Sequence, residues 1–240
     1  MASVDLGRIE AAVSELLAAL GDDPAREGLR ETPRRVAELY AELYAGVGTD
    51  PAAALGSVFT APGGEPAGTT RPGGTVTDAP GAVAASVPPA RTAQPVLMRD
   101  IAFRSVCEHH LLPFEGVAHV AYVPGEVLAG LGSIVAVVES ASSRPQLQER
   151  LTDDIAEALE RGLGARGVLV VLDARHGCVT ARGSRQTGST TLTLSARGEL
   201  SEPAARAEIV ALIGSPADAD AAAAADATAG AADGRDGNVR

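Results

Sequence analysis

The sequence predicts an α+β fold, and three observations lead to this prediction. Two segments in which apolar residues roughly alternate, 95–106 and 116–124, precede the middle of the chain, and two further strand-like segments, 167–183 and 189–198, follow it. Between these pairs lie two segments with helical character. The order of two strands, two helices and two strands, behind an N-terminal helical region, is typical of a mixed sheet-and-helix domain.

The N-terminal region, residues 1–61, is expected to hold two helices. Residues 6–20 repeat apolar side chains at helical spacing behind Asp5, whose carboxylate suits the N-cap position. A second helix is expected over residues 31–46, with Thr32 as its cap, Pro33 at its first helical position and Gly46 as its stop.

The segment 95–214 is predicted to be the main folded domain. Its first strand covers 95–106, and the second covers 116–124 and ends at Pro124. A short helix is expected over 131–142. The strongest helix covers 144–164, with Pro145 near its start, Gly164 near its end and an i, i+4 apolar stripe formed by Leu147, Leu151, Ile155 and Leu159. A last weak helix is expected over 201–214.

Two further segments differ in composition from the rest of the chain. Residues 62–94 form a Pro-, Gly- and Ala-rich stretch without periodicity, which predicts a flexible insertion on the surface. Residues 215–240 are rich in Ala and Asp and hold too few large apolar groups to fold alone, which predicts a disordered tail.

Charge and hydropathy argue against two classes of partner. The net charge of −11 disfavours binding to nucleic acid, because neutralising phosphates requires a basic face. No stretch approaches the ~20 apolar residues of a membrane span, and the first residues lack the basic head and apolar core of a signal peptide. The expected location is therefore the cytoplasm, without a membrane partner.

Three candidate metal ligands stand out among only four His and two Cys. Cys107 and His110 are spaced so that a turn could bring both side chains to one ion, and zinc accepts thiolate sulfur and imidazole nitrogen. His176 and Cys178 lie two apart in an expected strand and would point to the same face. Taken alone, the first pair is weak evidence, because one buried cysteine beside a polar loop histidine is the more common arrangement.

Cys107, His110 and Cys178 together would give three protein ligands and one open position, which is the pattern of catalytic zinc. His109 and His176 would then stand beside the ion as candidates for general acid and base. His119 fits the alternation of its strand and is expected to be structural.

Several long segments resemble the signature motifs of the GTP cyclohydrolase I family. These are CEHHLLPFEGVAHVAYVP from residue 107, RPQLQERLTDDIA from residue 144 and HGCVTARG from residue 176, together with REGLRETPRRVAELYAEL from residue 26. The resemblance implies a tunnelling fold (T-fold), an antiparallel four-stranded sheet with two helices on one face, whose subunits form a ring barrel and a homodecamer. It also implies a zinc-dependent reaction that opens the imidazole ring of GTP at C8, releases formate and forms 7,8-dihydroneopterin triphosphate.

The resemblance carries over residue by residue. Cys107, His110 and Cys178 match the Zn²⁺ ligands, and His109 and His176 match the catalytic histidines. Gln148 and Glu149 match the guanine-recognition pair, Arg182 matches a phosphate-contacting arginine, and Arg35 matches a basic residue that reaches the phosphates from a neighbouring subunit. Without the resemblance, Glu149 would be interpreted as a solvated carboxylate in the first turn of a helix, and Arg182 as an exposed arginine.

One stretch departs from the family pattern. Where the family has a Ser-Lys pair and an Arg three residues after the Lys, this chain has Gly132, Ser133 and Ala136. Two positive charges expected to bind the triphosphate are therefore missing. Each charge-assisted hydrogen bond contributes roughly 1.5–3 kcal/mol to the free energy of binding.

Several interpretations of this departure stay open. Other arginines could substitute, namely Arg104, Arg144 or Arg185. The chain could instead be a paralogue of the same fold that acts on a different guanine or pterin derivative. A non-catalytic scaffold subunit and a structural zinc module are further alternatives, although a scaffold would have no use for two histidines beside the metal ligands, and a structural site needs a fourth ligand.

Overall fold

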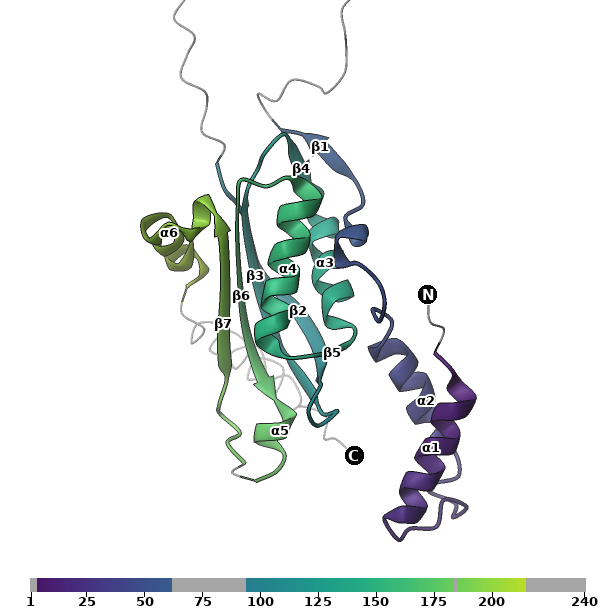
Figure 1. Ribbon diagram of the computed structural model, residues 1–240. Coiled ribbons are helices and arrows are strands. Elements are labelled where there is room, and N and C mark those ends of the chain that lie inside the picture. The colour runs from purple at the N-terminus through teal and green to yellow at the C-terminus, as the bar shows by residue number, and fades with distance from the viewer. Residues whose placement is uncertain (1–3, 62–93, 184, 215–240) are drawn as a thin grey trace, which may run out of the picture.

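The computed structural model describes residues 4–61, 94–183 and 185–214. A central sheet with helices on both faces forms the main body, and a helical hairpin stands beside it (Figure 1). The predicted α+β class is confirmed. The predicted tail and, apart from its last residue, the predicted insertion lie outside the described residues.

Four long antiparallel strands make up most of the sheet. Along the sheet they are ordered β2 (Val96–Cys107), β3 (Pro113–Val123), β6 (Gly167–His176) and β7 (Thr191–Gly198). The two-residue strand β5 (Pro145–Gln146) adds a fifth, parallel to the end of β2. The four antiparallel strands of the expected sheet are present, and β5 lies at their edge, where Pro145 begins an extended segment instead of a helix.

Helices α3 (Leu131–Ser142) and α4 (Gln148–Leu163) cover one face of this sheet (Figure 1). Leu151, Ile155 and Leu159 of the predicted stripe are completely buried in the core beneath them. Leu147 is the N-cap residue of α4 and not part of the helix, which begins later than the sequence predicts. Gly164 ends α4 in the left-handed conformation at φ 56°, which glycine adopts without steric cost.

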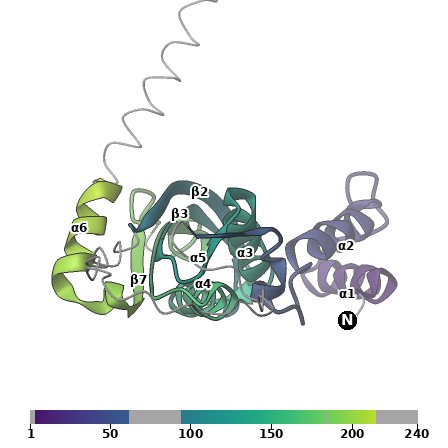
Figure 2. The ribbon, with the colours of Figure 1, turned by 90° about the horizontal axis from the view of Figure 1, so that it is seen from above.

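The opposite face is partly covered by the C-terminal elements. The 3₁₀ turn η2 (Glu199–Ser201) and helix α6 (Pro203–Ile213) follow β7. Leu200 and Ile209 from these elements pack on Val123, Leu169 and Val171 of the sheet. Figure 2 shows α6 on the far side of the sheet from α3 and α4.

The N-terminal helices α1 (Leu6–Ala19) and α2 (Thr32–Leu43) pack against each other and project away from the sheet (Figures 1 and 2). The predicted cap of α1 is confirmed, because Asp5 accepts the Arg8 N–H at 3.0 Å. Thr32 is not the cap of α2 as predicted; it is the first helical residue, and Glu31 precedes it without a capping bond. Pro33 in the first turn lacks an N–H and leaves no backbone donor unpaired there.

Three short elements join the hairpin to the sheet. The 3₁₀ turn η1 (Pro51–Ala54) contacts α3 and α4, and β1 (Val58–Thr60) pairs with β4 (Val127–Ala129) as a separate two-stranded sheet. The remaining helix is the single turn α5 (Gly177–Thr180) after β6. Among the residues that the structure describes, no helix combines the length and apolar character needed to cross a bilayer.

Candidate metal centre and active site

The first two candidate ligands are brought together by the tight turn that follows β2. The N–H of Cys107 donates to Leu112 O and the N–H of Leu111 donates to Cys107 O, both at 2.8 Å, so the chain reverses directly after the cysteine. Leu111 takes a positive φ of 53° in this turn. As a result, His110 Nδ1 lies 3.8 Å from Cys107 Sγ.

The third candidate ligand comes from α5. The sequence predicted Cys178 in a strand, but β6 ends at His176, and Cys178 lies in the helical turn that follows. Gly177 makes this turn possible, since a Cβ there would lie 2.8 Å from the Pro113 carbonyl oxygen. The turn therefore rests directly against the start of β3, near the end of the Cys107 loop.

The predicted meeting of the three ligands is confirmed. The donor atoms of Cys107, His110 and Cys178 lie within 4.8 Å of one another. Cys107 is buried, Cys178 is partly buried and His110 is exposed, so the cluster opens to solvent on the imidazole side. Burial and the nearby Cys107 sulfur raise the pKa of Cys178, whereas the Arg182 charge lowers it. Two sulfur atoms and one imidazole nitrogen at this spacing can hold a single cation.

His176 is held on both sides by neighbouring groups. Its ring stacks on Phe114 with the centroids 4.6 Å apart and the planes within 5°. Its Nε2 lies 2.6 Å from Gln148 Oε1. Burial lowers the pKa of His176, and the Glu149 carboxylate partly opposes this shift, so burial favours the neutral ring, which can accept a proton.

His109 is exposed beside His110, with the ring centroids 6.2 Å apart and the planes at 83°. The two adjacent residues thus direct their rings differently, which lets one bind a metal ion while the other stays free to move protons. His119 lies outside this cluster: it is 7% exposed in β3, and its Nδ1 accepts the Asp100 N–H at 3.2 Å. That contact supports its predicted structural role.

The start of α4 places two adjacent residues in opposite environments. Gln148 is 1% exposed, and its amide nitrogen lies near acceptors on β6 and β7. Glu149 is exposed in the first turn of the helix, where the helix dipole favours a carboxylate. Of the pair expected to contact guanine, Glu149 is the member whose side chain is open to a ligand.

The turn that carries Cys107 and His110 is hydrogen-bonded directly to the segment at the start of α4. The N–H of Glu108 donates to Gln146 O at 3.1 Å, and the Arg150 guanidinium donates to the Glu108 carboxylate at 2.8 Å. Sequence reasoning missed this ion pair and the ring of Phe114. Glu108 and Phe114 both lie inside the quoted motifs. Neither residue type is a zinc ligand of the expected thiolate or imidazole kind, so the residue types gave no reason to single them out.

The candidate phosphate contacts are dispersed. Arg182 is exposed directly after α5, and Arg35 is exposed on α2, in the hairpin apart from the sheet. Of the possible substitutes, Arg104 pairs with Glu42, Arg144 donates through Nε to Ala141 O at 3.2 Å, and Arg185 is exposed with a positive φ of 48°. Helix α3 itself carries no arginine or lysine.

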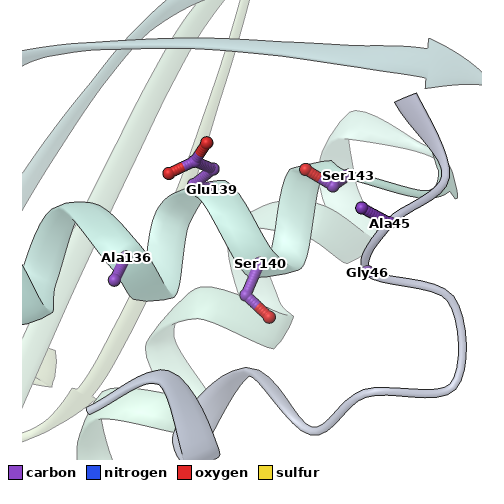
Figure 3. A pocket seen from close by; sticks show the side chains of 6 residues that line it. All are labelled: Ala45, Gly46, Ala136, Glu139, Ser140 and Ser143. Carbon is purple, nitrogen blue, oxygen red and sulfur yellow. The ribbon is translucent and has the colours of Figure 1, made fainter. Parts of the chain in front are cut away.

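A shallow cavity of about 270 Å³ lies beside α3, where the family arginine was expected. Its lining is shown in Figure 3: Ala45, Gly46, Ala136, Glu139, Ser140 and Ser143. Gly46 closes one side through its N–H, which donates to Ser143 O at 2.8 Å. Ala136 leaves the space unfilled, and the charged group among the six is the anionic Glu139, so this cavity offers no cation to a phosphate.

Comparison with known proteins adds independent findings. A family model described as GTP cyclohydrolase I matches residues 9–66 and 74–214. The chain is 54% identical over 214 residues to GTP cyclohydrolase 1 of Leifsonia xyli subsp. xyli, covering 89% of this chain and 98% of that protein. It is 44% identical over 211 residues to GTP cyclohydrolase 1 of Rhodopirellula baltica, covering 88% and 80%.

Among solved structures, the apo form of the archaeosine synthase QueF-Like matches with a TM-score of 0.37 and 18% identity, over 43% of this chain and 93% of that one.

Proposed function

This chain belongs to the GTP cyclohydrolase I family, and on that premise we propose that it opens the imidazole ring of GTP at C8, releases formate and forms 7,8-dihydroneopterin triphosphate. GTP cyclohydrolase activity is the function that the relatives support. The observation within the chain that carries the proposal is the convergence of Cys107, His110 and Cys178 from two distant segments.

These three residues fit zinc. Two sulfurs and one imidazole nitrogen suit a borderline-soft ion, and tetrahedral Zn²⁺ with bonds of about 2.0–2.3 Å places its donors roughly 3.5–3.8 Å apart. The Cys107 Sγ to His110 Nδ1 distance of 3.8 Å already matches. Zinc held here would supply the Lewis acidity that activates water for attack on C8, and three protein ligands leave one position for that purpose.

The two remaining histidines, His109 and His176, would carry out the proton transfers. His176 is partly buried and close to the cluster along the chain. As a neutral ring it can accept the proton that the attacking water releases and then pass it to a purine ring nitrogen as the ring opens. His109 is exposed at the same loop and can shuttle a second proton between solvent and substrate.

Glu149 would recognise the base. An exposed carboxylate accepts two N–H bonds from the guanine edge, and adenine lacks that pair of donors. A carboxylate left unpaired by the wrong base is penalised strongly, which gives discrimination.

Arg182 is the candidate phosphate contact nearest the cluster along the chain, because it follows α5 directly. Arg35 would reach the phosphates from a neighbouring subunit, in agreement with its place on a projecting hairpin. We propose a homo-oligomer, a decamer in the family pattern. The supporting observation is unburied apolar surface: α1 has no buried residue, and Leu16, Leu20, Leu192 and Leu194 are exposed.

A second candidate is a paralogue that acts on a guanine or pterin derivative with fewer phosphates. The specific observation in its favour is the cavity beside Ala136, which contains an anionic and not a cationic side chain.

One assay separates the two candidates. The protein is purified anaerobically, analysed for zinc, and incubated with GTP, GDP, GMP and guanosine while formate and pterin fluorescence are followed. Formate and fluorescence from GTP in preference to the others support the proposed function. Preference for a less phosphorylated compound supports the paralogue, and absence of formate from all four contradicts both.

A further inference from the structure

Gln148 lies at the start of α4, where the resemblance implies a guanine contact, but its surroundings indicate another role. Its side chain is 1% exposed and lies between the helix and the sheet. Nε2 of the amide is 3.2 Å from Leu172 O, 2.7 Å from Thr191 O and 3.1 Å from Thr193 Oγ1. Backbone carbonyl oxygens only accept hydrogen bonds, so the side of the amide that faces Leu172 and Thr191 must be the NH₂ group.

The hydroxyl groups nearby agree with this orientation. Thr152 Oγ1 donates its single proton to Gln148 O at 2.7 Å, so in its 2.6 Å contact with Thr193 it must accept. Thr193 therefore donates to Thr152, and its lone pairs face the Gln148 amide nitrogen. The two amide protons are then shared among three acceptors, and each hydroxyl proton has one consistent place.

The orientation of the Gln148 amide decides which ring nitrogen of His176 carries a hydrogen atom. With the NH₂ group turned to the two strands, Gln148 Oε1 faces His176 Nε2 at 2.6 Å. A carbonyl oxygen cannot donate, so Nε2 must carry a hydrogen atom. Neutral His176 is then the Nε2–H tautomer, and its unshared electron pair is on Nδ1. Phe114, itself 1% exposed, stacks on the ring and opposes its rotation.

We propose that Gln148 is a positioning residue that fixes His176 as the Nε2–H tautomer, so that Nδ1 is the atom that exchanges a proton with the substrate. This inference rests on the proposed catalytic role of His176. It assigns recognition of guanine to Glu149 without Gln148, whose amide has its donors committed inside the fold. Histidines in active sites are commonly oriented in this way through their second ring nitrogen.

The direct test is ¹⁵N solid-state NMR of the full-length, zinc-loaded protein labelled at the histidine rings, with the His176 signals assigned through a His176→Asn variant. We expect Nε2 to be the protonated nitrogen of the neutral ring and Nδ1 to be unprotonated. A protonated Nδ1 with a bare Nε2 would overturn the proposal. This reading does not depend on turnover, so loss or retention of activity in His176→Asn tests the proposed catalytic role separately.

Kinetics supply a second readout with a matched control. Gln148→Met removes the acceptor, and we expect kcat to fall about 10- to 100-fold with KM for GTP nearly unchanged. Gln146 is an equally buried glutamine (2% exposed) that bonds Ala141 and Asp154 and not His176. Gln146→Met should change kcat by less than about threefold, as expected for a substitution without a partner at the reacting atoms.

A large rise in KM for GTP with kcat unchanged in Gln148→Met would show guanine binding and refute the positioning role. A similar kcat loss in both variants would mean general damage to the core and would equally contradict it. If Gln148→Met does not fold, as judged by circular dichroism, the NMR measurement on the wild-type protein still decides.

Discussion

Cys107 and Cys178 place their sulfur atoms within 4.8 Å of each other, although one ends β2 and the other lies in the turn after β6. Strand β3 pairs with both β2 and β6, so its start lies between the two cysteines. The site therefore depends on the register of the central sheet as well as on the two local turns.

Replacing Cys178 by serine should abolish metal binding without unfolding the chain. The variant loses a thiolate ligand from a partly exposed turn, so we expect zinc to fall from about one ion per chain to a small fraction of that and activity to fall with it. Metal analysis after dialysis measures the change, and circular dichroism monitors the fold. Val179→Ala, at the exposed neighbour, is the control and should keep its zinc. Full zinc content in Cys178→Ser would contradict the assignment of this ligand.

Glu149→Gln should impair recognition of the base. The neutral amide offers one acceptor and a donor that opposes the guanine N–H groups, so kcat/KM for GTP should fall by about 10- to 100-fold for each charged hydrogen bond lost. Glu157→Gln, at an exposed position of the same helix, serves as the control and should leave kcat/KM almost unchanged. Equal effects of the two substitutions would show that Glu149 does not contact the base.

Restoring the missing charges beside the cavity should strengthen binding of the triphosphate. Ser133→Lys combined with Ala136→Arg adds two cations on α3, and we expect KM for GTP to fall by roughly 10- to 100-fold, less at high salt. A double variant with glutamine at both positions controls for side-chain length. No improvement, or an equal improvement for guanosine, would show that this face of α3 does not meet phosphate.

His119 should make the folded protein less stable in mild acid. Burial lowers its pKa below the usual value, opposed by Asp100, reinforced by Arg99 and opposed again by Asp173. Between the folded pKa and the unfolded value of about 6.5, the unfolded chain binds more protons, so the free energy of unfolding rises with pH. The full contribution of neutral His119 is present above about 6.5 and is lost as pH falls through the folded pKa.

The measurement is urea unfolding at a series of pH values for the wild type and for His119→Asn, whose side-chain oxygen can accept the Asp100 N–H as Nδ1 does. The difference between the two proteins should shrink as the pH falls below about 6.5, because the variant has no imidazole to protonate. A difference independent of pH would contradict the shift.

Much of the fold followed from periodicity. The helix over 131–142 was predicted with its observed bounds, and three of the four long strands were predicted within about three residues, because alternation and helical spacing are local properties of the sequence. The strand predicted over 167–183 begins as predicted but ends at His176. Strand β5 could not be predicted, since a two-residue strand exists only through its partner. The turn at Cys178 was missed because the preceding residues continue a strand pattern, and Gly177 ends it through a contact with Pro113.

The metal ligands of the site could be predicted from the sequence, but the environments of the surrounding residues could not. The three metal donors followed from residue type and spacing together with a family resemblance, and their meeting was confirmed. The burial of Gln148 beside the exposed Glu149 could not be predicted from two adjacent polar residues, because it depends on how α4 packs on β6 and β7. The stacking of Phe114 on His176 likewise arises from the register of β3 against β6, in which these two residues are partners.

The short parallel ladder of β5 with β2, reinforced by the Glu108–Arg150 ion pair, joins the cation-binding loop to the helix that presents Glu149. We expect occupancy at one end to alter the affinity at the other, and thermodynamic reciprocity requires the two effects on the equilibrium constants to be equal. A guanine compound without any phosphate should consequently raise the equilibrium affinity of the chain for the ion, measured in competition with a chelator, by the same factor by which the ion tightens the binding of that compound. Retention of the cation would thus report on purine binding even when no turnover occurs.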